Sequence, residues 1–173
     1  MHGRIAPSEE RLESIVESGL TNLTVCIDGF SQETYSRTRV GPNGVLGPED
    51  GVPTLIMGYE YYPEALAATI RRAWEVTKGE VPILVTENGI GTDDDDQRRA
   101  YVRTALEGVL DCIDEGIDVR GYTYWSLLDN FEWAYGYGPR FGIVECDRST
   151  FARTPKESAR WLGRVAQANA LVD

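Results

Sequence analysis

A glutamate stands at the point of this sequence where a buried strand is expected to end. Residues 83–85 are apolar without polar alternation, which predicts a strand buried on both faces, as in parallel sheets. Glu87 follows this run, and Gly89 and Gly91 then break the strand. Because α/β proteins carry out their chemistry at the C-terminal ends of the strands, Glu87 is a candidate catalytic carboxylate. The alternative is a polar strand end that caps the next helix.

A second stretch, residues 125–142, places aromatic rings among carboxylates and amides. Its two parts read WSLLDNFEW at residues 125–133 and GYGPRFG at residues 136–142. Indole rings stack on the C–H faces of a pyranose, while carboxylates and amides bind its hydroxyls. The stretch therefore predicts either a sugar-binding surface or a small aromatic core beneath a long loop.

The chain holds a single histidine, His2, beside the first methionine. Ser-His and Cys-His catalysis and histidine-rich metal sites are thereby excluded within this chain. The three cysteines, Cys26, Cys112 and Cys146, fit neither a metal pattern nor a disulfide framework, which favours a reducing environment. We therefore expect acid–base chemistry from carboxylates or tyrosines, no metal, no organic cofactor and a cytoplasmic location.

Length and charge restrict the class of partner. The chain has 173 residues, enough for one domain with a sizeable core. Its net charge of −11 disfavours nucleic acid and anionic membranes, and it favours neutral or cationic ligands. The first twenty residues are too polar for a signal peptide, and no apolar run is long enough to cross a bilayer.

Apolar periodicity predicts alternating helices and strands. Helices are expected at residues 8–18, 62–77, 97–115 and 155–168, strands at 20–27, 83–85 and 118–126, and long loops at 41–53 and 126–154. Helix-length crossovers between apolar strands predict right-handed βαβ units and a parallel sheet.

The three later helices carry further signals. The aspartates at 93–96 are expected to form the N-cap and first turn of a helix, because a calcium loop would need more widely spaced ligands. Residues 154–157 read as a capping box with proline at the first helical position. The residues expected to face the core are Leu66, Ile70, Ala73 and Trp74 in the first of these helices, Val102, Leu106, Val109, Leu110 and Ile113 in the second, and Trp161, Leu162 and Val165 in the last.

Several strings together resemble a known enzyme family. They are VTENG at residues 85–89, YWSLLDNFEWAYGY at 124–137 and RFGIVECD at 140–147, supported by TYSRTRV at 34–40 and MGYEYYPEAL at 57–66. In order and spacing they resemble the C-terminal portion of glycoside hydrolase family 1 β-glucosidases over residues 34–169. Residues 1–33 match poorly.

The resemblance implies the C-terminal part of a (β/α)8 TIM barrel, about strands six to eight with their helices. It also implies a retaining mechanism with two carboxylates. Glu87 matches the nucleophile, and Tyr35 matches the tyrosine that supports it by hydrogen bonding. Asn88 is expected to assist its neighbours rather than react. The matching sugar-binding residues are Trp125 as the platform, Glu132 and Trp133 on the distal hydroxyls, and Phe141 as a pocket wall.

The sequence departs from the family in the second carboxylate. A retaining enzyme needs an acid about 5–5.5 Å from the nucleophile. The family takes this acid from an Asn-Glu-Pro string, whereas this chain contains no Glu-Pro dipeptide. The resemblance assigns Glu132 to sugar hydroxyls, which leaves the acid role unfilled. We therefore expect a single truncated barrel domain over residues 1–173.

Two functions follow as expectations. The first is a β-glucosidase-like retaining glycosidase that acts on β-glucosides or short β-linked oligosaccharides, with its acid/base half missing from this chain and supplied by an N-terminal half. The second is an inactive barrel fragment that self-associates through open sheet edges or at most binds sugar. Neither involves nucleic acid or a membrane.

Overall fold

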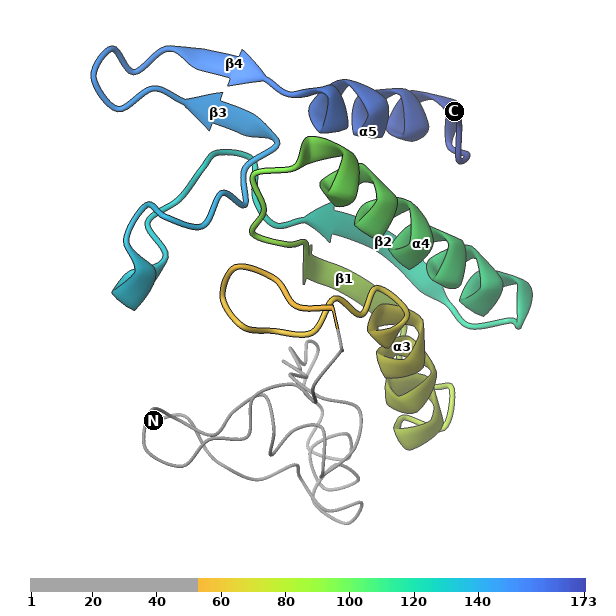
Figure 1. Ribbon diagram of the computed structural model, residues 1–173. Helices are drawn as coiled ribbons and strands as arrows, with labels where there is room; N and C mark the ends of the chain where they lie inside the picture. Colours follow the sequence, from red (N-terminus) through yellow and green to blue (C-terminus); the bar gives the residue numbers. More distant parts are fainter. Residues whose placement is uncertain (1–52) are drawn as a thin grey trace, which may run out of the picture.

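The computed structural model describes residues 53–173 (Figure 1). Its elements are α3 (Ala65–Val76), β1 (Ile83–Asn88), α4 (Asp95–Asp114), β2 (Val119–Tyr124), the 3-10 helix η1 (Trp133–Tyr135), β3 (Val144–Cys146), β4 (Arg153–Pro155) and α5 (Glu157–Ala168). Tyr35 and the helix, strand and loop expected before residue 53 lie outside the described residues.

The centre of the described part is a βαβ unit. Strands β1 and β2 pair in parallel, and α4 connects them (Figure 1). The predicted parallel pairing of these two strands is confirmed. Burial of β1 on both faces is wrong, because Leu84 is 60% exposed whereas Val85 is buried. Helix α3 packs against β1, and α4 packs against β2.

The main core lies between the strands and the two helices α3 and α4. Its buried members are Ala67, Ile70, Val85, Val109, Cys112 and Ile117. The two helices approach closely, since a Cβ atom added at Gly108 would lie 2.7 Å from the Cβ of Ala67. The predicted inner face of α3 is confirmed for Ile70, while Leu66 and Trp74 pack partly buried at the edge of this core.

The predicted inner face of α4 is partly wrong. Val102 and Val109 are buried, but Leu110 and Ile113 are 43% and 44% exposed. The buried stripe instead follows Arg98, Val102, Ala105, Val109 and Cys112. These positions are spaced alternately by four and three residues, so the stripe keeps the helical period and starts from a charged residue.

The start of α5 also differs from the prediction. Thr154 and Pro155 belong to β4, and α5 begins at Glu157 after an N-cap lysine, Lys156, whose side chain caps nothing. The free N–H of Ser158 is satisfied by Asp95 at the start of α4, at 2.8 Å. A tertiary contact has therefore replaced the local capping box.

The stretch expected to be one loop, residues 126–154, contains η1 and the antiparallel hairpin β3–β4. Asp147 shapes the hairpin turn, because its Oδ1 accepts hydrogen bonds from the N–H of Ser149 at 2.7 Å and of Thr150 at 2.9 Å. A hydrogen bond from the Ser149 hydroxyl, together with these two N–H bonds, holds the pKa of Asp147 down at about 2. Figure 1 shows the hairpin projecting beyond the N-terminal end of α5.

Helix α5 closes the other side of α4. Trp161 is buried and packs with Val102 and Tyr124, with Leu162 and Val165 partly buried around them, as predicted for this helix. The indole N–H of Trp161 donates to the carbonyl of Val172 at 2.9 Å, which ties the last residues to the helix. No helix within residues 53–173 is long and apolar enough to cross a membrane.

Candidate active site

The end of β1 presents Glu87 to solvent by means of an irregular pairing. Val85 packs in the core with Val109 of α4, and Asn88, three residues later, again contacts α4 through the hydroxyl of Tyr101. Residues three apart in a regular strand would point to opposite faces. The pairing of β1 with β2 shifts between Val85 and Asn88, and both Thr86 and Glu87 are exposed.

Asn88 is the anchor of this strand end. The hydroxyl of Tyr122 donates to its Oδ1 at 2.9 Å, and Tyr101 shares a hydrogen bond with its side chain. Burial raises the pKa of both tyrosines, so both hydroxyls keep their protons at neutral pH. The main chain next to Glu87 is thus fixed from α4 and from β2.

Trp125 lies directly beside this anchor. Its N–H donates to the carbonyl of Asn88 at 2.9 Å, and the indole side chain is 40% exposed. A Cβ atom added at Gly89 would overlap the carbonyl oxygen of Trp125. The glycine therefore allows the chain after Glu87 to pass against Trp125, which brings the candidate carboxylate and the candidate sugar platform to the same edge of the sheet.

Phe141 covers the glycine turn that follows Glu87. Its ring is so close that a Cβ atom added at Gly91 would lie 3.1 Å from its Cε2. The Phe141 carbonyl accepts from the hydroxyl of Tyr124 at 2.8 Å and from the N–H of Ser126 at 3.5 Å. Burial raises the pKa of Tyr124 to about 12, so this donor stays protonated.

Glu132 and Trp133 lie on a tight turn at η1. The N–H of Glu132 donates to the carbonyl of Gly136 at 2.6 Å, and the N–H of Tyr135 donates back to the carbonyl of Glu132 at 2.9 Å. The Glu132 side chain is half-buried, whereas Trp133 has a positive φ of 45° and is 83% exposed. The turn thus presents an indole ring to solvent next to a held carboxylate.

Lys156 joins the two aromatic segments at residues 125–130 and 139–142, an arrangement called the lysine clamp below. Lys156 Nζ donates to the carbonyl of Gly142 at 2.6 Å and to Asp129 Oδ1 at 3.1 Å, and that oxygen also accepts from the N–H of Gly142 at 2.9 Å. Burial and the nearby Arg98 charge lower the pKa of Lys156, and the Asp129 carboxylate opposes this effect. The clamp sets residues 125–130 against residues 139–142.

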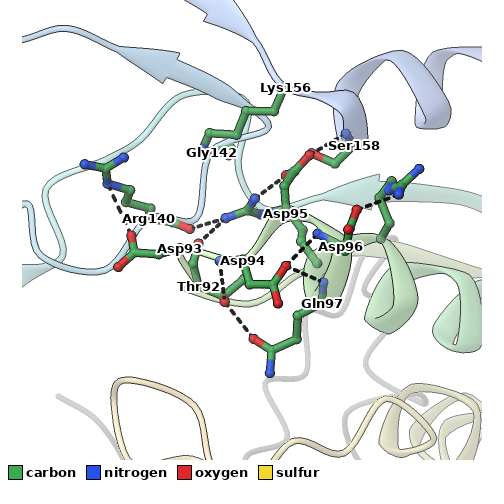
Figure 2. A network of polar contacts seen from close by, with 12 residues as sticks. Thr92, Asp93, Asp94, Asp95, Asp96, Gln97, Arg140, Gly142, Lys156 and Ser158 are labelled. Carbon is green, nitrogen blue, oxygen red and sulfur yellow. Dashed lines mark hydrogen bonds and ion pairs between the residues drawn. The ribbon is translucent and has the colours of Figure 1, made fainter.

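A buried arginine connects these segments to the glycine turn. Arg98 is 1% exposed, and its guanidinium donates to the carbonyls of Thr92 and Arg140, the second at 2.7 Å, and to Asp95. Figure 2 shows Thr92, Arg140 and Asp95 close to one another, with Ser158 of α5 bound to that aspartate. Two loops and the start of α4 are thereby fixed on one side chain.

The aspartates at 93–96 form a helix cap, as predicted. Asp94 Oδ1 accepts from the N–H of Asp96 at 2.9 Å and of Gln97 at 3.2 Å (Figure 2). The other three carboxylates pair with Arg140, Arg98 and Arg99. No group of three or more His, Cys, Asp or Glu residues that could hold a metal ion occurs between residues 53 and 173. Since Asp94 caps α4, Glu87 does not serve as its cap.

The described part of the chain thus brings Glu87, Trp125 and Phe141 together around the ends of β1 and β2. Glu87 and Trp125 meet through Asn88, and Phe141 lies over the glycine turn. Glu132 is joined to Asn130, whose Nδ2 donates to Glu132 Oε2 at 2.8 Å and whose Oδ1 lies 3.2 Å from the hydroxyl of Ser126, the residue after Trp125. Tyr35 lies outside the described residues.

Sequence reasoning missed the supporting roles of Arg98 and Asn130. Arg98 could have been found, because it stands four residues before Val102 on the buried stripe of α4. Asn130 carried only a weak signal, its place two residues before Glu132 in an aromatic segment.

Comparisons with known proteins identify the family of the chain. The model of the family described as "Glycosyl hydrolase family 1" matches residues 23–171. The thermostable β-glucosidase B of Thermobispora bispora is 46% identical over 187 aligned positions, covering 98% of this chain and 37% of that protein. The bifunctional β-D-glucosidase/β-D-fucosidase of Bifidobacterium breve is 40% identical over 159 positions, covering 83% of this chain and 34% of that protein.

A solved structure shows the same fold. The β-glucosidase of Thermotoga maritima in complex with deoxynojirimycin has a TM-score of 0.67 and 38% identity, covering 72% of this chain and 30% of that one. The chain spans about a third of the length of these relatives. With its βαβ unit and the matching strings at the C-terminal ends of β1 and β2, the chain belongs to glycosyl hydrolase family 1.

Proposed function

We propose that this chain carries the nucleophile half of a retaining β-glycosidase, with Glu87 as the nucleophile. The observation that carries the proposal is the exposed Glu87 carboxylate at the end of β1, fixed beside Trp125 by the bond between Asn88 and the Trp125 N–H, in a family 1 chain. In the first step the Glu87 carboxylate bonds to the anomeric carbon while the glycosidic oxygen leaves with its bonding electron pair. Water then hydrolyses the glycosyl-enzyme.

The proposed substrates are β-glucosides and short β-linked oligosaccharides. The indole of Trp125 offers the sugar a flat apolar face, the half-buried Glu132 accepts hydrogen bonds from its distal hydroxyls, Trp133 assists there, and Phe141 walls the pocket. A relative that acts as both β-D-glucosidase and β-D-fucosidase supports a pocket that admits more than one sugar.

The second carboxylate, the general acid, belongs in our proposal to the part of the relatives that this chain does not match. The described strands β1 and β2 would be the seventh and eighth of a (β/α)8 barrel, and residues 20–27 the sixth. Tyr35 would support Glu87 by a hydrogen bond. Because Cys112 and Cys146 are free thiols, we place this activity in a reducing, cytoplasmic setting.

The second candidate is an inactive fragment that associates with itself. The observation in its favour is Leu84 of β1, an aliphatic side chain 60% exposed on a strand. Sedimentation of the chain with and without Leu84→Lys would distinguish the two candidates. A dimer that the substitution dissociates supports self-association, whereas a monomer in both cases contradicts it.

The test of the nucleophile uses a substrate that needs no acid. A dinitrophenyl 2-deoxy-2-fluoro-β-glucoside has a leaving group that departs without protonation, and its fluorine slows hydrolysis of the glycosyl-enzyme. We expect the intact mass of the chain to rise by one fluoroglucosyl group, and peptide mapping to place the group on Glu87.

Two substitutions make the result specific. Glu87→Gln should abolish the mass increase, because the amide is a poor nucleophile. Glu107→Gln, a matched change at an exposed position of α4, should leave it intact. A label on another residue, or undiminished labelling of the Glu87→Gln chain, would refute the assignment.

A further inference from the structure

Asn130 links the Glu132 carboxylate to the segment that follows β2. Its Nδ2 donates to Glu132 Oε2 at 2.8 Å, and its Oδ1 lies 3.2 Å from the hydroxyl of Ser126. The same hydroxyl donates to the carbonyl of Leu128 at 2.7 Å. Ser126 is buried and follows Trp125 directly, so the chain of contacts begins beside the proposed sugar platform.

The orientation of the Asn130 amide follows from its partners. A flipped amide would turn its oxygen toward the Glu132 carboxylate, and two acceptors would then face each other without a proton. The carboxylate therefore requires the Nδ2 donor on its side. A hydrogen bond to a charged acceptor is stronger than one between neutral groups, so the Glu132 side chain is held in one direction.

This contact leaves Glu132 with a defined set of free acceptor sites. An ionised carboxylate has about four lone-pair positions, of which Asn130 occupies one on Oε2. The backbone of Glu132 is fixed as well, by its hydrogen bonds to Gly136 and Tyr135. Sugar hydroxyls that donate to the remaining sites must approach along directions that the protein has already set.

We propose that Asn130 is a positioning residue that fixes the Glu132 carboxylate and so determines which sugar epimers bind. The inference rests on the proposed function. Glucose and galactose differ in one distal hydroxyl, which is equatorial in the first and axial in the second. A fixed carboxylate meets one of these hydroxyls better than the other, whereas a freely turning carboxylate adapts to both.

The charged groups around Asn130 are engaged with other partners. The neighbouring Asp129 is paired with Lys156 at 3.1 Å, and the Arg148 guanidinium donates to the Asp129 carbonyl and lies over the ring of Tyr137. The side-chain contact with Glu132 runs through Asn130. Changes at Asn130 therefore act on the Glu132 carboxylate and on the 3.2 Å contact with the Ser126 hydroxyl, and Asn130→Asp keeps an acceptor for the second.

The experiment measures the dissociation constants of methyl β-glucoside and methyl β-galactoside for the full chain, by the quenching of tryptophan fluorescence. For the unsubstituted chain we expect a clear difference between the two sugars. Asn130→Ala removes the donor to Glu132, and the ratio of the two constants should move toward one. The better-bound sugar should lose roughly tenfold in affinity, the scale of a hydrogen bond to a charged group.

A second variant gives a signature that a merely structural role would not produce. Asn130→Asp keeps the shape of the side chain but sets two carboxylates against each other, and such a pair retains one proton at a higher pH than an isolated carboxylate. Binding should therefore be weak at neutral pH and recover in mild acid. Asn169→Asp, the same change at the exposed C-cap of α5, should leave binding and its pH dependence unchanged.

The outcomes separate this inference from the proposed function. Saturable binding by the unsubstituted chain, with an unchanged sugar ratio in Asn130→Ala and no pH recovery in Asn130→Asp, would overturn the role of Asn130 alone. Absence of saturable binding by the unsubstituted chain would overturn the sugar site itself. A shifted ratio together with recovery in acid supports the inference.

Discussion

Arg98 is the side chain whose loss should damage the described part of the chain most. Arg98→Met keeps a long apolar stem in a site that is 1% exposed, and it removes the whole guanidinium. Three acceptors then lose a donor: the carbonyls of Thr92 and Arg140 and the carboxylate of Asp95. The loops after β1 and β2 would no longer share an anchor.

The expected cost follows from these three acceptors. The buried Thr92 carbonyl is left without a partner, which costs about 1–3 kcal/mol, whereas the Arg140 carbonyl keeps the N–H of Thr92 at 3.2 Å. Asp95 keeps both hydrogen bonds from Ser158, at 2.8 Å and 2.7 Å, and its side chain is 26% exposed, so water shares its charge. We expect a loss of about 3 kcal/mol in the free energy of unfolding, the lower end of the range of about 3–5 kcal/mol for breaking a buried pair.

The loss should also depend on pH in a defined direction. Burial tends to raise the pKa of Asp95, but hydrogen bonds from Ser158 and Arg98 outweigh burial and lower it below the ordinary value. A lowered folded-state pKa contributes stability that is present above about pH 4 and disappears as the pH falls through the folded-state value. The difference between the original chain and Arg98→Met should therefore shrink in acid.

The assay is urea unfolding followed by tryptophan fluorescence and far-ultraviolet circular dichroism, at neutral pH and in acid. Arg99→Met is the matched control, since Arg99 pairs with the exposed Asp96 at 2.6 Å on the same helix turn and should cost less than about 1 kcal/mol. If Arg98→Met and Arg99→Met lower the unfolding free energy equally, the reasoning about the buried network is refuted.

Two further predictions concern the strand end and the tyrosines. Gly89→Ala would push a methyl group into the Trp125 carbonyl, so it should abolish labelling of Glu87. The control is Gly163→Ala, which has open space on α5 and should add about 1 kcal/mol to the free energy of unfolding. Equal labelling of Glu87 in both variants would contradict this prediction. Burial raises the pKa of Tyr122, and that of Tyr124 to about 12. The stability linked to these two raised pKa values is fully present below about pH 10 and is lost as the pH rises through the folded-state pKa values. Absorbance at the tyrosinate band should therefore rise late in base, with a smaller late step in Tyr124→Phe.

The parts of the fold that sequence predicted rest on local periodicity. The apolar spacing of α3, α4 and α5 and the run before Glu87 are properties of short segments, and each produced an element near its predicted position. The βαβ pairing followed because two apolar strands separated by one helix have few other ways to bury their residues. The cap at Asp94 followed from the aspartate run itself.

The parts that sequence could not predict depend on distant contacts. The prediction of a capping box before α5 was wrong, because Asp95, more than sixty positions earlier, supplies the acceptor for the N–H of Ser158. The prediction that Leu84 is buried was wrong, because the apolar character of a strand does not reveal what covers each of its faces. Arg98 and Asn130 act through carbonyl and carboxylate partners that only the folded arrangement brings within reach.

The hydrogen bond from the Trp125 N–H to the Asn88 carbonyl has a kinetic consequence. This amide proton can exchange with deuterated water only when the end of β1 parts from the segment after β2, at a distance of 2.9 Å in the closed arrangement. The same opening would separate Glu87 from the indole of Trp125. The exchange rate of one backbone proton therefore reports how often this surface comes apart, with no sugar and no turnover needed.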